Sequence, residues 1–172
     1  MAADTKKAFR RQISLANLEE LDAELERVRA AHHAGTIRTS GNWSPGQNLG
    51  HLAKWMGWYL DGSFPFKAPT LIRFVGGIFK KKIISSPFRP GLKFVPKSGD
   101  LGGDPEYAFE DGWDRLQLQL DRLRAGETLA CDTPLVGRVT HDEGLMIQLN
   151  HCALHLGFIH YDGTPMDADR PG

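Results

Sequence analysis

The chain contains 172 residues, and its 21 lysines and arginines are balanced by 21 aspartates and glutamates. A chain of this length usually forms one domain with a sizeable core, so we expect a single domain over residues 1–172. The formal net charge of zero argues against nucleic acid as a partner, because nucleic-acid-binding proteins usually carry a basic excess.

The sequence has neither a disulfide framework nor a membrane signal. Cys131 and Cys152 form no CxxC motif, and Cys152 falls inside a helical pattern, which favours a packed core thiol and a reducing compartment. Residues 1–12 lack the apolar core of a signal peptide, and no apolar run has the length of a membrane span. We therefore expect a cytoplasmic protein with no membrane partner.

The first predicted helix follows a basic, polar segment, residues 1–13, that we expect to be a flexible arm. Asn17 can cap this helix, and Glu20 has the spacing of the acidic residue in a capping box. The helix is expected to run to about His33. Apolar residues at helical spacing predict its buried stripe: Leu18, Leu21, Leu25 and Val28.

A stronger start signal marks the second helix. In the sequence WSPGQN at 43–48, the serine can cap the helix, the proline suits its first position, and the glutamine can close a capping box. The helix is predicted from about Pro45 to Leu60, before an Asp-Gly pair. His51 lies on its mostly apolar surface, where a single histidine is more often a hydrogen-bonded core residue than a metal ligand.

Residues 61–104 form a long connection that is rich in proline and glycine. Within it, residues 70–84 can form a short helix, which we expect to be interrupted at 76–77, where two glycines follow each other. The run Lys80–Lys82 can indicate a membrane surface or an anionic partner, but three lysines are few and a solvated turn is the preferred interpretation. Such long connections are often functional, and this one would also permit a crossover between the ends of a bundle.

The third helix is predicted to begin at 104–105, where an aspartate and a proline again combine a capping residue with a first-turn proline. Its apolar stripe continues to about Ala125, and Gly126 marks its end. A short strand at 135–139 is compatible with the following segment, but the fold does not require it.

The fourth helix, predicted over residues 141–161, holds the most informative pattern. Thr140 and Glu143 have capping-box spacing, which accounts for Glu143 better than a role as general base. His151 and His155 are four residues apart, so they project from nearly one face of the helix, about one turn apart. Two imidazoles in this arrangement can bind one metal ion.

Four capped amphipathic helices without a convincing hairpin predict an all-α fold, a four-helix bundle. If the long connection between helices 2 and 3 is a crossover, the topology is up-down-down-up and helices 2 and 4 run antiparallel. His51 then lies level with His155 and about one turn from His151. In an up-down-up-down bundle the histidines would instead differ in level by roughly 6 to 12 Å.

The sequence WSPGQNLGHLAKW at 43–55, followed by NHCALHLGF at 150–158, resembles the DinB/YfiT-like superfamily of metalloenzymes. Within it, the chain is similar to the domain-of-unknown-function 1569 branch, through the first motif and the run TPLVGRVTHDEGLMIQLNHCALHLGFI. The similarity extends from helix 1 to helix 4. It implies an up-down-down-up bundle with three metal ligands: His51, His151 and His155.

The resemblance also implies chemistry. Relatives use a divalent metal such as zinc or nickel, and some are thiol-dependent transferases or isomerases that use low-molecular-weight thiols. The branch pattern has a histidine before Pro134 and a tryptophan in the first turn of the fourth helix. This chain has Thr133 and Gly144 at those positions, and the departure bears on the shape of the pocket more than on the three ligands.

Three functional hypotheses follow. The first is a metal-dependent transferase that uses a thiol, with a small molecule or a low-molecular-weight thiol as partner. The second is a metal-dependent hydrolase with the same three ligands and an activated water. The third is a non-catalytic binding or stress-response module. Homodimers are common among bundles with large exposed aromatic faces, and a homodimer is kept as one arrangement.

Overall fold

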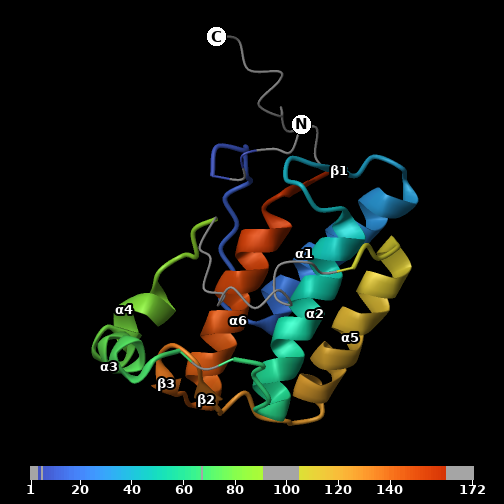
Figure 1. The fold of residues 1–172 in the computed structure, drawn as a ribbon. Coiled ribbons are helices and arrows are strands. Elements are labelled where there is room, and N and C mark those ends of the chain that lie inside the picture. The colour runs from blue at the N-terminus through green and yellow to red at the C-terminus, as the bar shows by residue number, and fades with distance from the viewer. Residues whose placement is uncertain (1–3, 5, 67, 91–104, 162–172) are drawn as a thin grey trace.

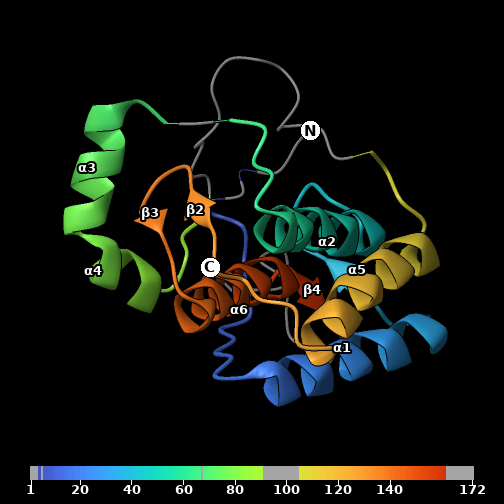
Figure 2. The same cartoon turned by 90° about the horizontal axis from the view of Figure 1, so that it is seen from below.

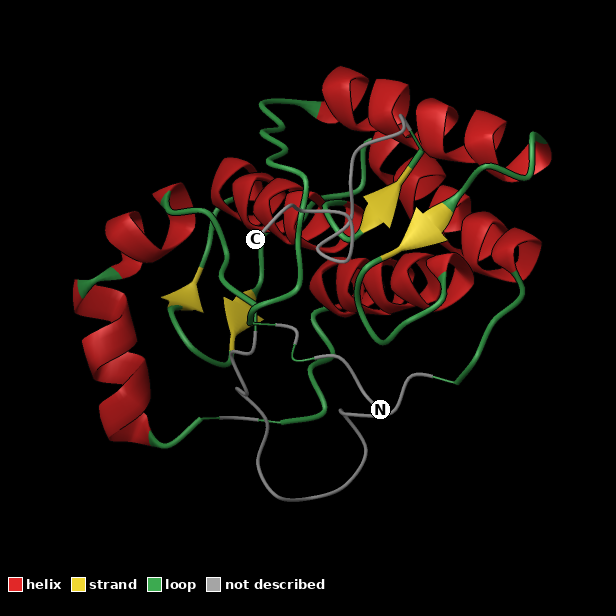
Figure 3. Cartoon of the chain, turned by 90° about the horizontal axis from the view of Figure 1, so that it is seen from above, coloured by secondary structure: helices red, strands yellow, loops and turns green. Residues whose placement is uncertain are grey.

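The structure, a computed structural model, describes residues 4, 6–66, 68–90 and 105–161, which are mostly helical (Figures 1 and 3). The expected all-α class is met only approximately, because two small antiparallel sheets join loop segments: residues 38–39 pair with 159–160, and residues 132–133 pair with 137–138. The helices are α1 (Leu18–His33), α2 (Pro45–Asp61), α3 (Thr70–Ile78), α4 (Lys80–Ser85), α5 (Phe109–Arg124) and α6 (His141–Leu156). The strands are β1 (Arg38–Thr39), β2 (Asp132–Thr133), β3 (Gly137–Arg138) and β4 (Ile159–His160).

Three of the predicted helix starts are confirmed by their capping bonds. Asn17 caps α1 with its side-chain oxygen. At α2 the backbone of Gln47 donates to Ser44, and the Gln47 side chain accepts from the Ser44 backbone. Thr140 and Glu143 form the same reciprocal pair at α6. Local hydrogen-bonding chemistry therefore sets where these helices begin.

The predicted start of the third helix is wrong. The helix α5 begins at Phe109, and its cap residue Ala108 makes no side-chain capping bond. Residues 105–108 instead pass so close to α2 that a Cβ on Gly46 would collide with the carbonyl oxygens of Tyr107 and Ala108. This close packing holds the segment outside the helix, and Asp104 lies outside the described residues.

The fourth helix is shorter than predicted. The helix α6 ends at Leu156 rather than at residue 161, and the chain turns at Gly157 into β4. There Ile159 and His160 pair with β1, so the last predicted turn is replaced by sheet hydrogen bonds. The Asp-Gly pair at 162–163 lies outside the described residues.

The middle connection contains two helices, and the predicted break is misplaced. The helix α3 runs through both glycines and ends at Ile78. Gly76 lies against the β2–β3 hairpin so closely that a Cβ would collide with the Leu135 carbonyl oxygen, which explains a glycine there. The run Lys80–Lys82 forms the first turn of α4 rather than a solvated turn.

Helices α2 and α5 run parallel. Near the start of α2, Gly46 lies against Gly112 of α5, where a Cβ on Gly112 would come within 3.0 Å of the Gly46 backbone. Further along both helices, Gly57 lies next to Gln119. Because α2 and α5 are parallel neighbours, the chain has to return along their length between the end of α2 and the start of α5.

Helices α2 and α6 run antiparallel, and so do α1 and α5. Early in α2, Asn48 contacts His155, whereas the later Trp55 lies beside His151, which is earlier in α6. At the other pair, the end of α1 stacks on the start of α5 and the start of α1 forms an ion pair with the end of α5. None of the described helices combines the length and the apolar character needed to cross a membrane.

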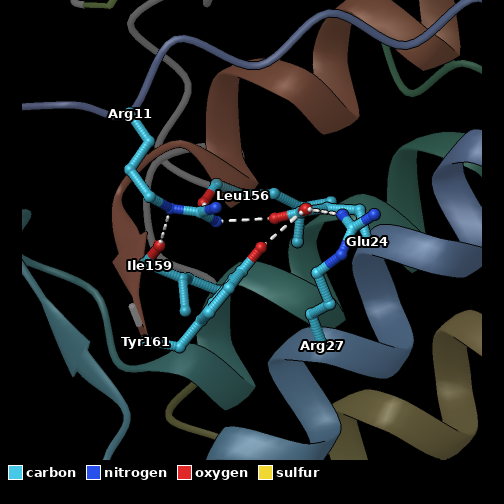
Figure 4. Close-up of polar contacts among 6 residues, drawn as sticks. All are labelled: Arg11, Glu24, Arg27, Leu156, Ile159 and Tyr161. Carbon is cyan, nitrogen blue, oxygen red and sulfur yellow. Dashed lines mark hydrogen bonds and ion pairs between the residues drawn. The ribbon is translucent and has the colours of Figure 1, made fainter. Parts of the chain in front are cut away.

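Arg11 links the segment before α1 to α1 and to the residues around the end of α6 (Figure 4). Its guanidinium lies 2.6 Å from a carboxylate oxygen of Glu24, donates to the Ile159 carbonyl at 2.5 Å, and donates to the Leu156 carbonyl at 3.0 Å. The hydroxyl of Tyr161 donates to the second Glu24 oxygen at 2.9 Å. These bonds tie α1 to the end of α6.

Candidate metal centre

Three histidines from two helices converge at the α2–α6 contact. The Nε2 atoms of His51 and His151 lie 3.2 Å apart, and one ring nitrogen from each of these residues and from His155 falls within 4.8 Å of the other two. Two nitrogens bound to one tetrahedral zinc would lie roughly 3.3 Å apart, given zinc–nitrogen bonds of about 2.0–2.1 Å. The three side chains are therefore close enough to hold one ion, as the antiparallel arrangement of these helices predicts.

The three histidine rings lie on the inner sides of α2 and α6. His51 is 7% exposed and His151 is 8% exposed, and His155 is partly buried. The ring centroids of the three residues lie between 4.5 and 5.1 Å apart. The four-residue spacing in α6 stacks two of the rings on one face, and the capped start of α2 fixes the level of the third.

Asn48 orients His155. The amide nitrogen of Asn48 donates to the carbonyl oxygens of Trp43 at 3.4 Å and Ser44 at 3.0 Å, so its amide oxygen faces outward. That oxygen lies 3.2 Å from Nδ1 of His155. Because the oxygen can only accept, Nδ1 carries the proton and Nε2 keeps the lone pair that a metal needs. Asn48 lies three residues before His51, and this helical spacing was the signal available in the sequence.

Aromatic rings form a wall around the cluster. Trp43 stacks on His155 with centroids 5.4 Å apart, and Trp55 lies edge-on to His151 at 5.4 Å. Phe88, which follows α4, lies 6.2 Å from His151. The three aromatic side chains are half-buried, so they limit the access of water while leaving part of the wall open to solvent.

The pKa of His155 lies well below its ordinary value. Although its ring is partly accessible, packed neighbours remove most of its hydration, and His151, His51 and Arg10 then add positive charge nearby. The neutral imidazole that results is the form that binds metal ions. Arg10 comes from the segment before α1, donates to the Phe88 carbonyl at 3.4 Å, and had no signal in the sequence.

Glu143 already has hydrogen-bond and ion-pair partners at the start of α6. Besides the capping bonds, its carboxylate lies 2.5 Å from the Lys80 ammonium. The hydrogen bond from Lys80, followed by the bond from the Thr140 backbone, lowers the pKa of Glu143. These partners explain the residue as a structural one, as the capping pattern predicted.

Both cysteines are packed thiols, which confirms the prediction for Cys152. They belong to the core cluster and are free. Burial raises the pKa of Cys152 to about 12, and burial and the nearby Asp132 raise that of Cys131 to about 11. Neither forms the thiolate that a nucleophile or metal ligand requires near neutral pH.

The remaining described histidines have other contacts. Nδ1 of His141 accepts a hydrogen bond from a backbone amide at 3.3 Å. His160 is fully buried, with Nε2 2.9 Å from the Ser40 hydroxyl. His32 stacks on Phe109 at 3.8 Å and borders a cavity of about 340 Å³ at the start of α2, which none of the three clustered histidines lines.

The two departures from the branch pattern have structural roles. The hydroxyl of Thr133 donates to the Gly137 carbonyl at 2.9 Å and accepts from the Val136 backbone at 3.2 Å, which closes the β2–β3 hairpin. A Cβ at Gly144 would lie 2.6 Å from the Leu129 carbonyl oxygen. The backbone of Leu129 therefore excludes a larger side chain from this position.

The fold and the site together define a mostly helical protein in which three close histidines could hold a metal ion. The profile of the family described as Protein of unknown function (DUF1569) matches residues 9–162, and the chain belongs to this family. No curated protein and no solved structure matches the chain.

Proposed function

We propose that His51, His151 and His155 bind one divalent metal ion, zinc or nickel. The observation that carries the proposal is the convergence of three imidazole nitrogens from two helices within 4.8 Å. The neutral state of His155 and its orientation by Asn48 support it, because a metal ligand needs a free lone pair.

The donor set favours a reactive site over a closed structural one. Three imidazoles leave a fourth position for an exogenous ligand, and imidazole suits both zinc and nickel. A divalent metal held in this way lowers the pKa of a water or a thiol. Arg10 adds positive charge near His155, and the aromatic wall provides apolar contact. A substrate with an anionic group and an apolar body suits these surroundings.

The proposed activity is that of a thiol-dependent transferase. Arg10 would help to hold an anionic thiol, and Trp43 and Trp55 would pack against the group that is transferred. A metal-dependent hydrolase is the alternative, since the same residues can position a water. The resemblance to the DinB/YfiT-like superfamily supports the first choice.

We extend the proposal to the fold and to the setting of the protein. The parallel pair α2 and α5, together with the antiparallel pairs α2–α6 and α1–α5, supports an up-down-down-up four-helix bundle of the DinB/YfiT-like type. In this arrangement residues 1–172 form one domain of a cytoplasmic protein.

Metal analysis of protein purified without a polyhistidine tag tests the site. We expect about one zinc or nickel per chain, and a loss of affinity of more than about 100-fold in H51A and H151A, because removing a ligand should exceed the effect of removing an outer partner. His33→Ala is the matched control, since His33 is exposed at the end of α1. Unchanged metal content in H151A would overturn the proposal.

A second experiment separates the activities. Metal-loaded protein is mixed with a panel of low-molecular-weight thiols, and its thermal unfolding is recorded. Protection that requires both metal and thiol supports the transferase, whereas ester hydrolysis without any thiol supports the hydrolase. Metal binding with neither result leaves a non-catalytic binding module.

A further inference from the structure

Exposed apolar side chains are concentrated on α3 and α4. Eight large hydrophobic residues of the described chain are exposed, and seven of them lie between residues 71 and 83. The two helices lie at one edge of the molecule, beside the β2–β3 hairpin and outside α2 and α6 (Figure 2). The most exposed of the seven are Leu71, Phe74, Ile78 and Phe79, at 73%, 66%, 64% and 54%.

The opposite side of α3 is attached to the protein. Arg73 forms an ion pair with Asp132 at 2.5 Å, and Gly76 lies against the Leu135 carbonyl. At the start of α4, Lys80 forms an ion pair with Glu143. With its inner side held in this way, α3 turns an apolar stripe at helical spacing toward solvent, the α3 outer face: Leu71, Phe74, Val75 and Ile78.

The surrounding sequence is strongly basic. Residues 62–99 contain eight of the 21 basic residues of the chain and none of its 21 acidic residues. Residues 62–99 therefore carry a formal charge of +8, although the net charge of the whole chain is zero. Among the described residues of this segment, Lys81 and Lys82 are exposed directly after the α3 outer face.

We infer that α3 and α4 dock onto the surface of an anionic lipid bilayer. The α3 outer face enters the boundary between headgroups and acyl chains, and Lys81 and Lys82 contact the lipid phosphates. With nine residues, α3 is about 13 Å long, which suits a helix lying in the plane of the interface. This inference is independent of the metal site.

The chemistry of the surface favours lipid over two other partners. Nucleic acid is bound through its phosphates and needs no exposed stripe of leucine, isoleucine and phenylalanine. A second copy of this chain would bring the exposed Lys81 and Lys82 of one copy close to those of the other, which opposes association. An anionic bilayer complements both the apolar stripe and the positive charge.

Vesicle co-sedimentation tests the apolar part of the inference. The full chain is mixed with phosphatidylcholine vesicles that contain or lack phosphatidylglycerol. We expect binding only to the anionic vesicles, and a loss of at least about tenfold in the double variant F74S/I78S, because two exposed apolar side chains no longer enter the bilayer. Leu118→Ser is the matched control, since Leu118 is 60% exposed on α5, and its binding should equal that of the wild type.

A second pair of variants tests the charge. K81E/K82E should reduce the binding by at least about tenfold, because both lysines lose their attraction to the anionic surface and the glutamates are repelled by it. Lys6→Glu with Lys7→Glu makes the same charge change in the exposed N-terminal segment and should have a much smaller effect. Added sodium chloride should weaken wild-type binding. Circular dichroism confirms that each variant is folded.

Four results would overturn the inference. The first is equal or absent binding of the wild type to both kinds of vesicle. The second is unchanged binding in F74S/I78S or in K81E/K82E. The third is a dimer in light scattering that F74S/I78S converts to a monomer, which would assign the surface to a second copy. The fourth is DNA binding that K81E/K82E abolishes and F74S/I78S does not.

Discussion

The molecule contains two polar clusters, one around Glu24 and one formed by three histidines, and they differ in how their charges and donors are paired. In the cluster around Glu24, a carboxylate that is 4% exposed receives Arg11, Arg27 and the hydroxyl of Tyr161 (Figure 4). Its charge is met by opposite charge and by donors from three parts of the chain. In the histidine cluster, three bases of one kind are directed at a common point.

The difference separates a cluster that holds the fold from one that can hold a ligand. A buried charge with complete partners is already compensated and gains little from a further group. The histidine cluster disfavours a proton on His155, because burial and then His151, His51 and Arg10 lower the pKa of that residue, whereas a metal ion can bind the lone pairs of all three rings. Changes in the first cluster should therefore affect stability, and changes in the second should affect ligand affinity.

The largest effect, a loss in the free energy of unfolding, is expected from Glu24→Gln. The change leaves the guanidinium of Arg11, whose side chain is 10% exposed, without its countercharge. Removing one member of a buried ion pair costs about 3–5 kcal/mol in the free energy of unfolding. Urea denaturation of the metal-free protein measures the loss.

The matched control for this prediction is Glu26→Gln, two residues further along the same helix. Glu26 is exposed, and its change should alter the free energy of unfolding by no more than about 0.5 kcal/mol. The folded fraction of E24Q should bind metal as the wild type does. Equal stability in the two variants would contradict a fold-holding role for Glu24.

A smaller effect, on metal affinity, is expected from Asn48→Ala. The variant removes the oxygen that receives Nδ1–H of His155, so the ring loses its fixed orientation. Loss of such an outer partner typically weakens metal binding by about 10–100-fold. Competition titration of zinc against a chromophoric chelator measures the change.

Asn150→Ala controls for the loss of a partly buried amide. The side chain of Asn150 donates to the Ile84 carbonyl, a backbone group outside the histidine cluster, at 2.7 Å. Both variants should lose stability, but only N48A should lose metal affinity. The same affinity in N48A and the wild type would show that Asn48 does not orient a ligand.

The features that could be predicted from the sequence are those that depend on residues close together in the chain. The capping patterns at Asn17, Ser44 and Thr140 predict the helix starts correctly, because each capping residue and its partner lie within three residues. The pairing of His151 with His155 was also accessible, since the four-residue spacing places both rings on one face of a helix. The addition of His51 depended on the crossover topology and on the resemblance to a known family, not on local geometry.

The errors came from contacts between distant segments. The start of α5 is set by the close passage of residues 105–108 over α2, and the end of α6 by pairing with β1. No local pattern contains this information. Glu24 did carry a signal, because it lies beside Leu21 and Leu25 on the apolar stripe of α1, but its partner Arg11 lies in a segment that reads as a flexible arm.

The smallest effect concerns pH, and it follows from the direction of the His155 pKa. In the folded protein this pKa is lowered, first by burial and then by His151, His51 and Arg10, whereas in the unfolded chain it returns to about 6.5. Below this value the unfolded chain binds a proton that the folded protein does not. The free energy of unfolding of the metal-free protein should therefore fall with decreasing pH, by at most about 1.4 kcal/mol per unit from this group.

The variant His155→Gln isolates this contribution. Glutamine keeps an N–H that can reach Asn48 but does not titrate, so the carboxylates and the histidines outside the cluster act alike in both proteins. The free energy of unfolding of the wild type minus that of H155Q should be constant above pH 7. It should decrease below about pH 6.5, because only the unfolded wild-type chain gains a proton at residue 155. Parallel curves across this range would mean that the cluster accepts a proton as readily as the unfolded chain. A site that accepts a proton so easily would also lose metal affinity as the pH falls below about 6.5, because the proton competes for the same lone pair.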